Sequence, residues 1–91
     1  RSFDELTQAL QQGVEKIAIL TDPTRNPAAI AELLLSLDLP SRYQIWVCEN
    51  LGGQDERVTE TLAPTSLLHQ SFASLTLVVL QKVINDETLT V

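Results

Sequence analysis

The chain has 91 residues, of which 44% are hydrophobic, and twelve acidic against six basic residues give a formal net charge of −6 at pH 7. This length suffices for one domain with a single core, so we expect residues 1–91 to fold as one unit. Nucleic acid is not an expected partner, because phosphate backbones are bound by clusters of Lys and Arg, which this acidic sequence lacks.

No segment of the sequence has the pattern of a membrane span or a targeting leader. The longest apolar runs, such as LTLVVL at 75–80, are too short to cross a bilayer, and no basic and apolar leader precedes the first predicted helix. Cys48 is the single cysteine, so no internal disulfide can form, and its apolar surroundings are typical of a reduced structural thiol. We therefore expect a soluble, unsecreted, cytoplasmic protein with no membrane partner.

The first predicted helix begins at a capping box, in which Ser2 is followed three residues later by Glu5, and it ends at Gly13. Residues 16–20, with the sequence KIAIL, form an apolar run without a polar face. Such a run predicts a strand that is covered on both sides.

Asn26 and Pro27 predict the start of a second helix, because Asn caps free N–H groups and Pro sets the first turn. Residues 44–48, QIWVC, form the second predicted strand. The strand-helix-strand order predicts a right-handed crossover with the two strands parallel. The loops at 21–26 and 49–55 would then lie at the same edge of the sheet.

The rest of the chain predicts a weak strand at 57–61, a short helix at 64–68 and a firm strand at 74–80. Residues 85–86 predict a turn that leads into a final edge strand. Together these elements predict a three-layer α/β subdomain, in which helices flank a small mixed, mainly parallel sheet of about four or five strands.

In open α/β sheets, ligands bind beyond the carboxyl ends of the strands. Glu49 and Asn50 follow the second strand and can hydrogen-bond a polar ligand, while Gly52 and Gly53 permit close backbone approach and positive φ angles. The same residue types also make plain turns. Asp22 likewise suits either a ligand hydroxyl or amine, or the opening of a turn before Pro.

The sequence predicts neither a catalytic group nor a metal site. His69 has no Ser, Cys or second His at a catalytic spacing, and we interpret it as a surface residue. Cys48 has no CxxC partner and no flanking cation to lower its pKa, and one Cys with one His cannot form a metal site. The residues alone thus predict an α/β domain that contributes half of a small-molecule site.

Three stretches together resemble a known family: ILTDPTRNPAAIAELLL at 19–35, QIWVCENLGGQDERV at 44–58 and FASLTLVVLQK at 72–82. They are similar to the C-terminal subdomain of the precorrin-6Y C5,15-methyltransferases, in the tetrapyrrole methylase family. The resemblance runs from about residue 1 to residue 82. It implies an enzyme of cobalamin biosynthesis that binds S-adenosylmethionine between two α/β subdomains and methylates a ring carbon of a corrin precursor.

The resemblance also implies which residues contact the cofactor. Leu20 stands where relatives have a Met, and Leu51 stands where they have a small residue whose backbone faces the adenosyl group. The larger Leu51 side chain departs from that pattern, although a backbone contact would survive the change. The full set of cofactor contacts that the resemblance implies is Leu20, Thr21, Asp22, Asn50, Leu51, Gly52, Ala73, Ser74 and Leu75.

The family's N-terminal subdomain, with its Gly-Pro-Gly loop and most of the substrate trough, has no counterpart in this sequence. The resemblance therefore implies that the chain supplies one wall of the cofactor cleft, meets its precorrin substrate through that subdomain and is inactive alone. A homodimer is an assembly that the sequence leaves open. The alternative is a stand-alone α/β protein-binding or oligomerisation module without methyltransferase activity, which docks a partner through a sheet edge.

Overall fold

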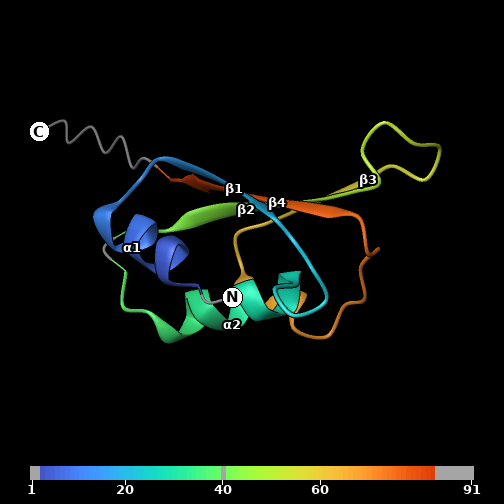
Figure 1. The fold of residues 1–91 in the computed structure, drawn as a ribbon. Helices are drawn as coiled ribbons and strands as arrows, with labels where there is room; N and C mark the ends of the chain where they lie inside the picture. The colour runs from blue at the N-terminus through green and yellow to red at the C-terminus, as the bar shows by residue number, and fades with distance from the viewer. Residues whose placement is uncertain (1–2, 40, 84–91) are drawn as a thin grey trace, which may run out of the picture.

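The computed structural model describes residues 3–39 and 41–83, which form a small α/β domain (Figure 1). Its strands join into one four-stranded sheet. In chain order the described elements are α1 (Asp4–Gln12), β1 (Lys16–Leu20), α2 (Pro27–Ser36), β2 (Tyr43–Glu49), β3 (Arg57–Thr61), the 3-10 helix η1 (Pro64–Leu67) and β4 (Thr76–Lys82). The sequence predicted each of these elements to within a few residues.

The sheet is antiparallel throughout, so the prediction of a mainly parallel sheet is wrong. The strand order is β1-β4-β2-β3, and Val78 in β4 pairs with Ile19 of β1 on one side and with Val47 of β2 on the other. β1 and β2 therefore run in the same direction, as their connection through α2 requires, but β4 separates them. The local sequence pattern predicts strands well, yet it does not indicate which strand lies between two others.

α1, α2 and η1 all lie on one face of the sheet, which gives two layers where we predicted three (Figure 1). Along β2, buried residues that face the helices alternate with half-buried residues on the other face. The prediction that β1 is covered on both sides is also wrong, because Leu20 is 79% exposed. An apolar run cannot by itself tell a strand buried on both faces from one whose second face meets solvent.

The core lies between the helices and the sheet face toward them. Tyr43 belongs to it, and its hydroxyl donates a 2.8 Å hydrogen bond to the carbonyl oxygen of Val14, which satisfies the buried polar group. Burial raises the pKa of Tyr43 above its ordinary value. The buried hydrophobic residues are Leu6, Leu10, Ile19, Ile30, Ala31, Leu34, Tyr43, Ile45, Val47, Leu67, Val78 and Leu80.

The helix ends follow the sequence signals in part. The Asn26 side chain caps α2 by accepting a 2.9 Å hydrogen bond from the N–H of Ala29, as predicted. Gly13 ends α1 in the left-handed conformation with φ of 74°. The N-cap residue of α1 is Phe3, without a side-chain cap bond; Ser2, the predicted cap, lies outside the described residues, as do the predicted turn at 85–86 and the strand after it.

Candidate functional site

β1 and β2 end on either side of the start of β4. Thr21 donates both its backbone N–H, at 3.2 Å, and its hydroxyl, at 2.8 Å, to the carbonyl oxygen of Thr76. Asn50 donates its backbone N–H to the carbonyl oxygen of Leu75 at 3.0 Å. Three segments distant in the sequence therefore meet at one edge of the sheet. We call this region the carboxyl edge; it comprises residues 20–22, 49–52 and 73–76.

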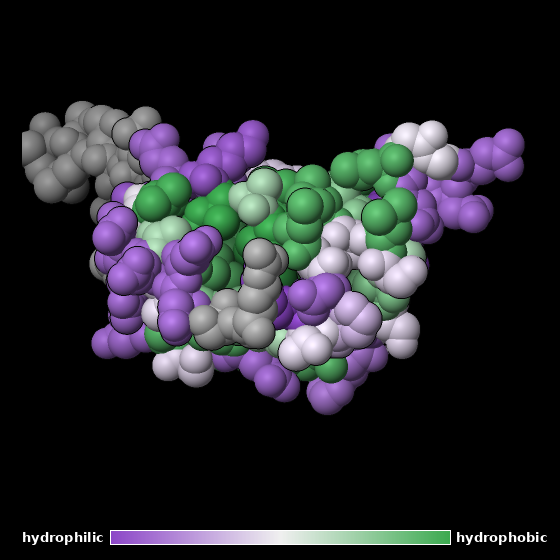
Figure 2. All heavy atoms as spheres, viewed as in Figure 1, coloured by the Kyte–Doolittle hydropathy of each residue, from purple (hydrophilic) through white to green (hydrophobic). Residues whose placement is uncertain are grey.

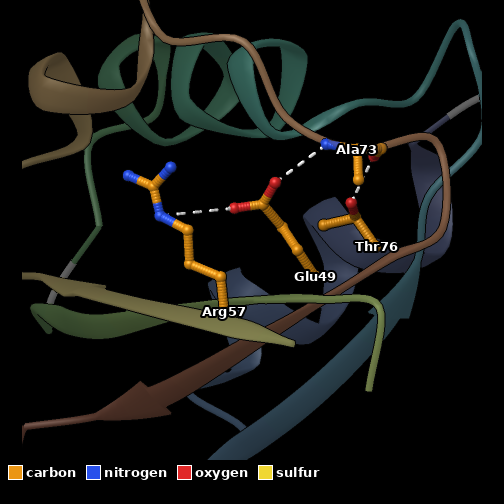
Figure 3. A network of polar contacts seen from close by, with 4 residues as sticks. All are labelled: Glu49, Arg57, Ala73 and Thr76. Atoms are coloured by element: carbon orange, nitrogen blue, oxygen red, sulfur yellow. Dashed lines mark hydrogen bonds and ion pairs between the residues drawn. The ribbon is translucent and has the colours of Figure 1, made fainter. Parts of the chain in front are cut away.

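Glu49, the last residue of β2, connects two parts of this region on the sheet face that the helices cover (Figure 3). It is only 7% exposed, and its Oε2 accepts a 2.9 Å hydrogen bond from the backbone N–H of Ala73. Its Oε1 lies 3.8 Å from the Nε of Arg57 and accepts no hydrogen bond from the described residues. One oxygen of the carboxylate thus holds the loop before β4.

The loop before β4 is fixed at a second point. The Thr76 hydroxyl donates to the carbonyl oxygen of Ala73 at 2.5 Å, which closes a tight turn just before the strand (Figure 3). Thr76 is buried beside Glu49 in the register of β2 and β4. Both backbone groups of Ala73 are therefore bound by side chains of the sheet, which gives the 70–75 segment a defined path without regular secondary structure.

The turn after β2 is built from left-handed residues. Asn50 has φ of 50° and Gly52 has φ of 82°, and both values lie where glycine and asparagine are tolerated best. The carbonyl oxygen of Asn50 accepts from the N–H of Gly53 at 2.9 Å, and the carboxylate of Glu56 accepts from the N–H of Gly52 at 3.0 Å. The sequence indicated the glycines but not Glu56, which closes the turn. Leu51, at its tip, is 50% exposed.

Asp22 organises the loop after β1. Its Oδ1 accepts hydrogen bonds from the N–H of Thr24 at 2.9 Å and of Arg25 at 2.6 Å. The Arg25 N–H is the main cause of a lowered pKa for this carboxyl group, because it stabilises the charged form. Of the two interpretations of Asp22, these bonds support the one in which it opens a turn.

A cleft of about 350 Å³ opens between the loop after β1, the start of α2 and the segment before β4. This volume falls within the ~300–1,000 Å³ typical of small-molecule sites. Four residues of the predicted site line it, namely Thr21, Asp22, Ala73 and Ser74. The other five lie at the carboxyl edge but outside its described lining: Leu20, Asn50, Leu51, Gly52 and Leu75.

The sequence missed much of the lining of this cleft. Asn26, Pro27 and Ala28 line it from the start of α2, and Gln70, Ser71 and Phe72 line it from the segment before β4. The capping pair Asn26 and Pro27 was a usable signal, since only the short loop 21–25 separates this helix start from the end of the first strand. For Gln70 to Phe72 the sequence carries no such signal.

The described residues offer no assembled metal site, and no described helix is long and apolar enough to cross a membrane. His69 is exposed, as predicted. Cys48 is half-buried on the sheet face away from the helices. Burial, and to a smaller extent the negative charge of Glu56, raise the pKa of the Cys48 thiol, which keeps it protonated and weakly nucleophilic near neutral pH.

Comparison with protein-family models, with curated proteins and with solved structures finds no match for this chain.

Proposed function

We propose that the chain is the C-terminal subdomain of a tetrapyrrole methylase and supplies one wall of the cleft that binds S-adenosylmethionine. The enzyme of which it is part would methylate precorrin-6Y, with decarboxylation, during cobalamin biosynthesis in the cytoplasm. One observation supports this above the others. The cofactor contacts implied by the resemblance come from three segments distant in the sequence, and all three meet at the carboxyl edge.

The residues that line the cleft are of the types that could contact part of an adenosyl group. The cleft is lined by the polar residues Thr21 and Ser74 and by the apolar Phe72, a mixture typical of small-molecule and cofactor sites. At the carboxyl edge, outside the lining of the cleft, Leu20 and Leu51 expose apolar surface that a second subdomain would remove from water. Their solvent exposure in this chain fits a site that is completed from outside it.

S-adenosylmethionine would supply the methyl group from its sulfonium. The residues of this chain would bind and orient it. Asp22, bound to two backbone N–H groups, and Glu49, bound to Ala73, would keep the loops around the cleft in shape. Methyl transfer needs donor and acceptor atoms held in line at near-attack distance, and one wall cannot fix both. We therefore expect weak cofactor binding and no turnover from this chain alone.

The net charge of the chain bears on where the substrate would bind. Corrin precursors carry several carboxylates, and a chain with a net charge of −6 repels them. The cationic groups that hold the substrate would then come from the N-terminal subdomain, and this chain would contact mainly the cofactor.

Calorimetric titration with S-adenosylhomocysteine tests the proposal. The chain alone and the chain joined to a tetrapyrrole methylase N-terminal subdomain would be titrated in parallel, and we expect at least tenfold tighter binding by the longer protein. Ala28→Trp, which fills the cleft, should abolish that binding. Leu35→Trp on the exposed side of α2 is the matched control and should leave it unchanged. The proposal would be contradicted if neither protein binds S-adenosylhomocysteine, or if Ala28→Trp does not affect the binding.

A second candidate function is a protein-binding or oligomerisation module without methyltransferase activity. The observation that favours it is the sheet face opposite α1 and α2, which no described helix covers and which is rich in apolar residues. This candidate predicts no response to S-adenosylhomocysteine from either protein in the titration.

A further inference from the structure

Glu49 and Thr76 form a polar pair inside a hydrophobic layer. The two residues are register partners in β2 and β4 and lie on the sheet face toward the helices, where both are buried. Apart from Tyr43, no other described residue with a polar side chain is buried. In the space-filling view, hydrophobic residues form a band at the level of the sheet (Figure 2). Because unpaired polar groups are costly to bury, polar side chains in such a layer need specific partners.

Both residues bind Ala73. Glu49 accepts a 2.9 Å hydrogen bond from its backbone N–H, and the Thr76 hydroxyl donates to its carbonyl oxygen at 2.5 Å (Figure 3). Residues 71–74 all line the cleft. Within the described part of the chain, Ala73 is the one of these four residues whose backbone makes hydrogen bonds. This wall of the cleft is therefore anchored to the sheet at Ala73. We call Glu49 and Thr76 the clamp.

Thr76 also binds a second wall of the cleft, the loop after β1. Its carbonyl oxygen accepts the hydroxyl of Thr21 at 2.8 Å and the backbone N–H of Thr21 at 3.2 Å, and Thr21 lines the cleft. One residue of β4 thus holds one wall through its hydroxyl and the other through its carbonyl group. Neither Thr76 nor Glu49 is among the described residues that line the cleft.

We propose that Glu49 and Thr76 are positioning residues, which hold the wall formed by residues 71–74 in its ligand-binding shape. A ligand is bound more tightly by a wall that is already ordered, because less conformational freedom is lost on binding. Removal of either clamp side chain should therefore weaken binding, although neither lines the cleft. The identity of the ligand, an adenosyl compound, rests on the proposed function, whereas the order of the wall does not.

Nitrogen-15 relaxation of this chain measures the order of the wall without any ligand. Thr76→Val removes the hydroxyl and keeps the shape of the side chain, whereas Thr76→Ser keeps a hydroxyl. In the natural chain we expect the amides of residues 71–74 to be rigid, with order parameters of about 0.85. The order parameters should fall below about 0.6 in Thr76→Val and in Glu49→Ala. They should stay high in Thr76→Ser and Glu49→Gln, and the order parameters of α1 should not change in any variant.

Calorimetric titration with S-adenosylhomocysteine then tests binding by the chain joined to a tetrapyrrole methylase N-terminal subdomain. We expect Thr76→Val and Glu49→Ala to bind about fivefold more weakly or worse, as the loss of one hydrogen bond implies. Thr76→Ser and Glu49→Gln should restore most of the affinity. Thr59→Val in β3 is the matched control, since it makes the same chemical change outside the clamp, and it should bind like the natural protein. Circular dichroism checks that each variant is folded.

The two measurements separate the clamp from the identity of the ligand. Residues 71–74 that are mobile in the natural chain, or that stay rigid in both Thr76→Val and Glu49→Ala, would overturn the proposal. So would a joined protein that binds S-adenosylhomocysteine equally well with and without the clamp side chains. If the order parameters change as expected and the natural joined protein binds no S-adenosylhomocysteine, the clamp is supported and the proposed function is contradicted.

Discussion

The carboxylate of Glu49 and the backbone N–H of Ala73, which are 24 residues apart, form a partly buried hydrogen bond of 2.9 Å. The bond joins the end of β2 to the segment that lines the cleft before β4 (Figure 3). Because this segment has no regular secondary structure, its shape depends on such side-chain contacts. The wall of the cleft is therefore set by a residue that does not line it.

We expect Glu49→Ala to lower the free energy of unfolding by ~1–3 kcal/mol, because it removes a partly buried hydrogen bond to a charged group. Glu49→Gln should cost less, since the amide oxygen can still accept from Ala73. Arg57→Gln should change stability by ~0.5 kcal/mol or less, because that side chain is 67% exposed and its ion pair with Glu49 is long. Urea unfolding measures all three. An Arg57→Gln effect as large as that of Glu49→Ala would show that the ion pair, and not the Ala73 bond, matters.

The turn after β2 should be sensitive at Gly52. An added Cβ there meets no atom within 4 Å, but the φ of 82° is strained for any residue with a side chain. Gly52→Ala should therefore destabilise the fold by ~1 kcal/mol through backbone strain alone. The measurement is the melting temperature of Gly52→Ala, compared with that of Gln54→Ala, an exposed change in the same turn. Equal melting temperatures for the two variants would argue against the strain.

Asp22 should make stability depend on pH in the acid range. Its pKa is lowered in the folded state, mainly by the Arg25 N–H, whereas the unfolded carboxyl titrates near its ordinary value of ~3.9. Its stabilising contribution is thus complete above that ordinary value and is lost as the pH falls through the lower folded pKa. Asp22→Asn should be less stable than the natural chain at pH 6, and the difference should shrink toward pH 2. Urea midpoints across this range, with Asp38→Asn as an exposed control, give the test; a constant difference would reject it.

The reactivity of the Cys48 thiol should depend on the negative charge of Glu56. Because the carboxylate contributes to the raised pKa of Cys48, Glu56→Gln should lower that pKa and increase the thiolate fraction. We expect iodoacetamide to alkylate this variant faster at pH 8, by roughly two- to threefold. Asp55→Asn in the same turn is the matched control. Unchanged rates for Glu56→Gln would show that burial alone raises the pKa.

The sequence predicted the elements of this fold better than their arrangement. Local signals sufficed for α2, whose Asn26 cap forms as expected, and for the turn at Gly52. The meeting of the loops after β1 and β2 was also predicted, since both strands run in one direction. The place of β4 between them was not, because pairing between distant strands leaves no local pattern. The apolar run of β1 likewise does not show that only one of its faces is covered.

The candidate site also contains residues that the sequence predicted and residues that it missed. Thr21, Asp22, Ala73 and Ser74 were predicted and line the cleft. Phe72 was missed, because it reaches the cleft only through the path that the segment before β4 takes. That path depends on the Glu49 bond, which joins residues too far apart for spacing arguments.

The central position of β4 has a consequence for how the chain folds during synthesis. β4 is the last described strand to leave the ribosome, and β1 and β2 have no direct contact in the sheet without it. Before residues 76–82 emerge, the described elements that the chain can form are α1, α2, η1 and the β2–β3 hairpin, and the edges of β1 and β2 that pair with β4 stay unpaired. Folding then waits for contacts between distant segments, which slows it and prolongs the time in which nascent edges can associate wrongly. A nascent chain stalled before β4 would therefore be the form most in need of a chaperone.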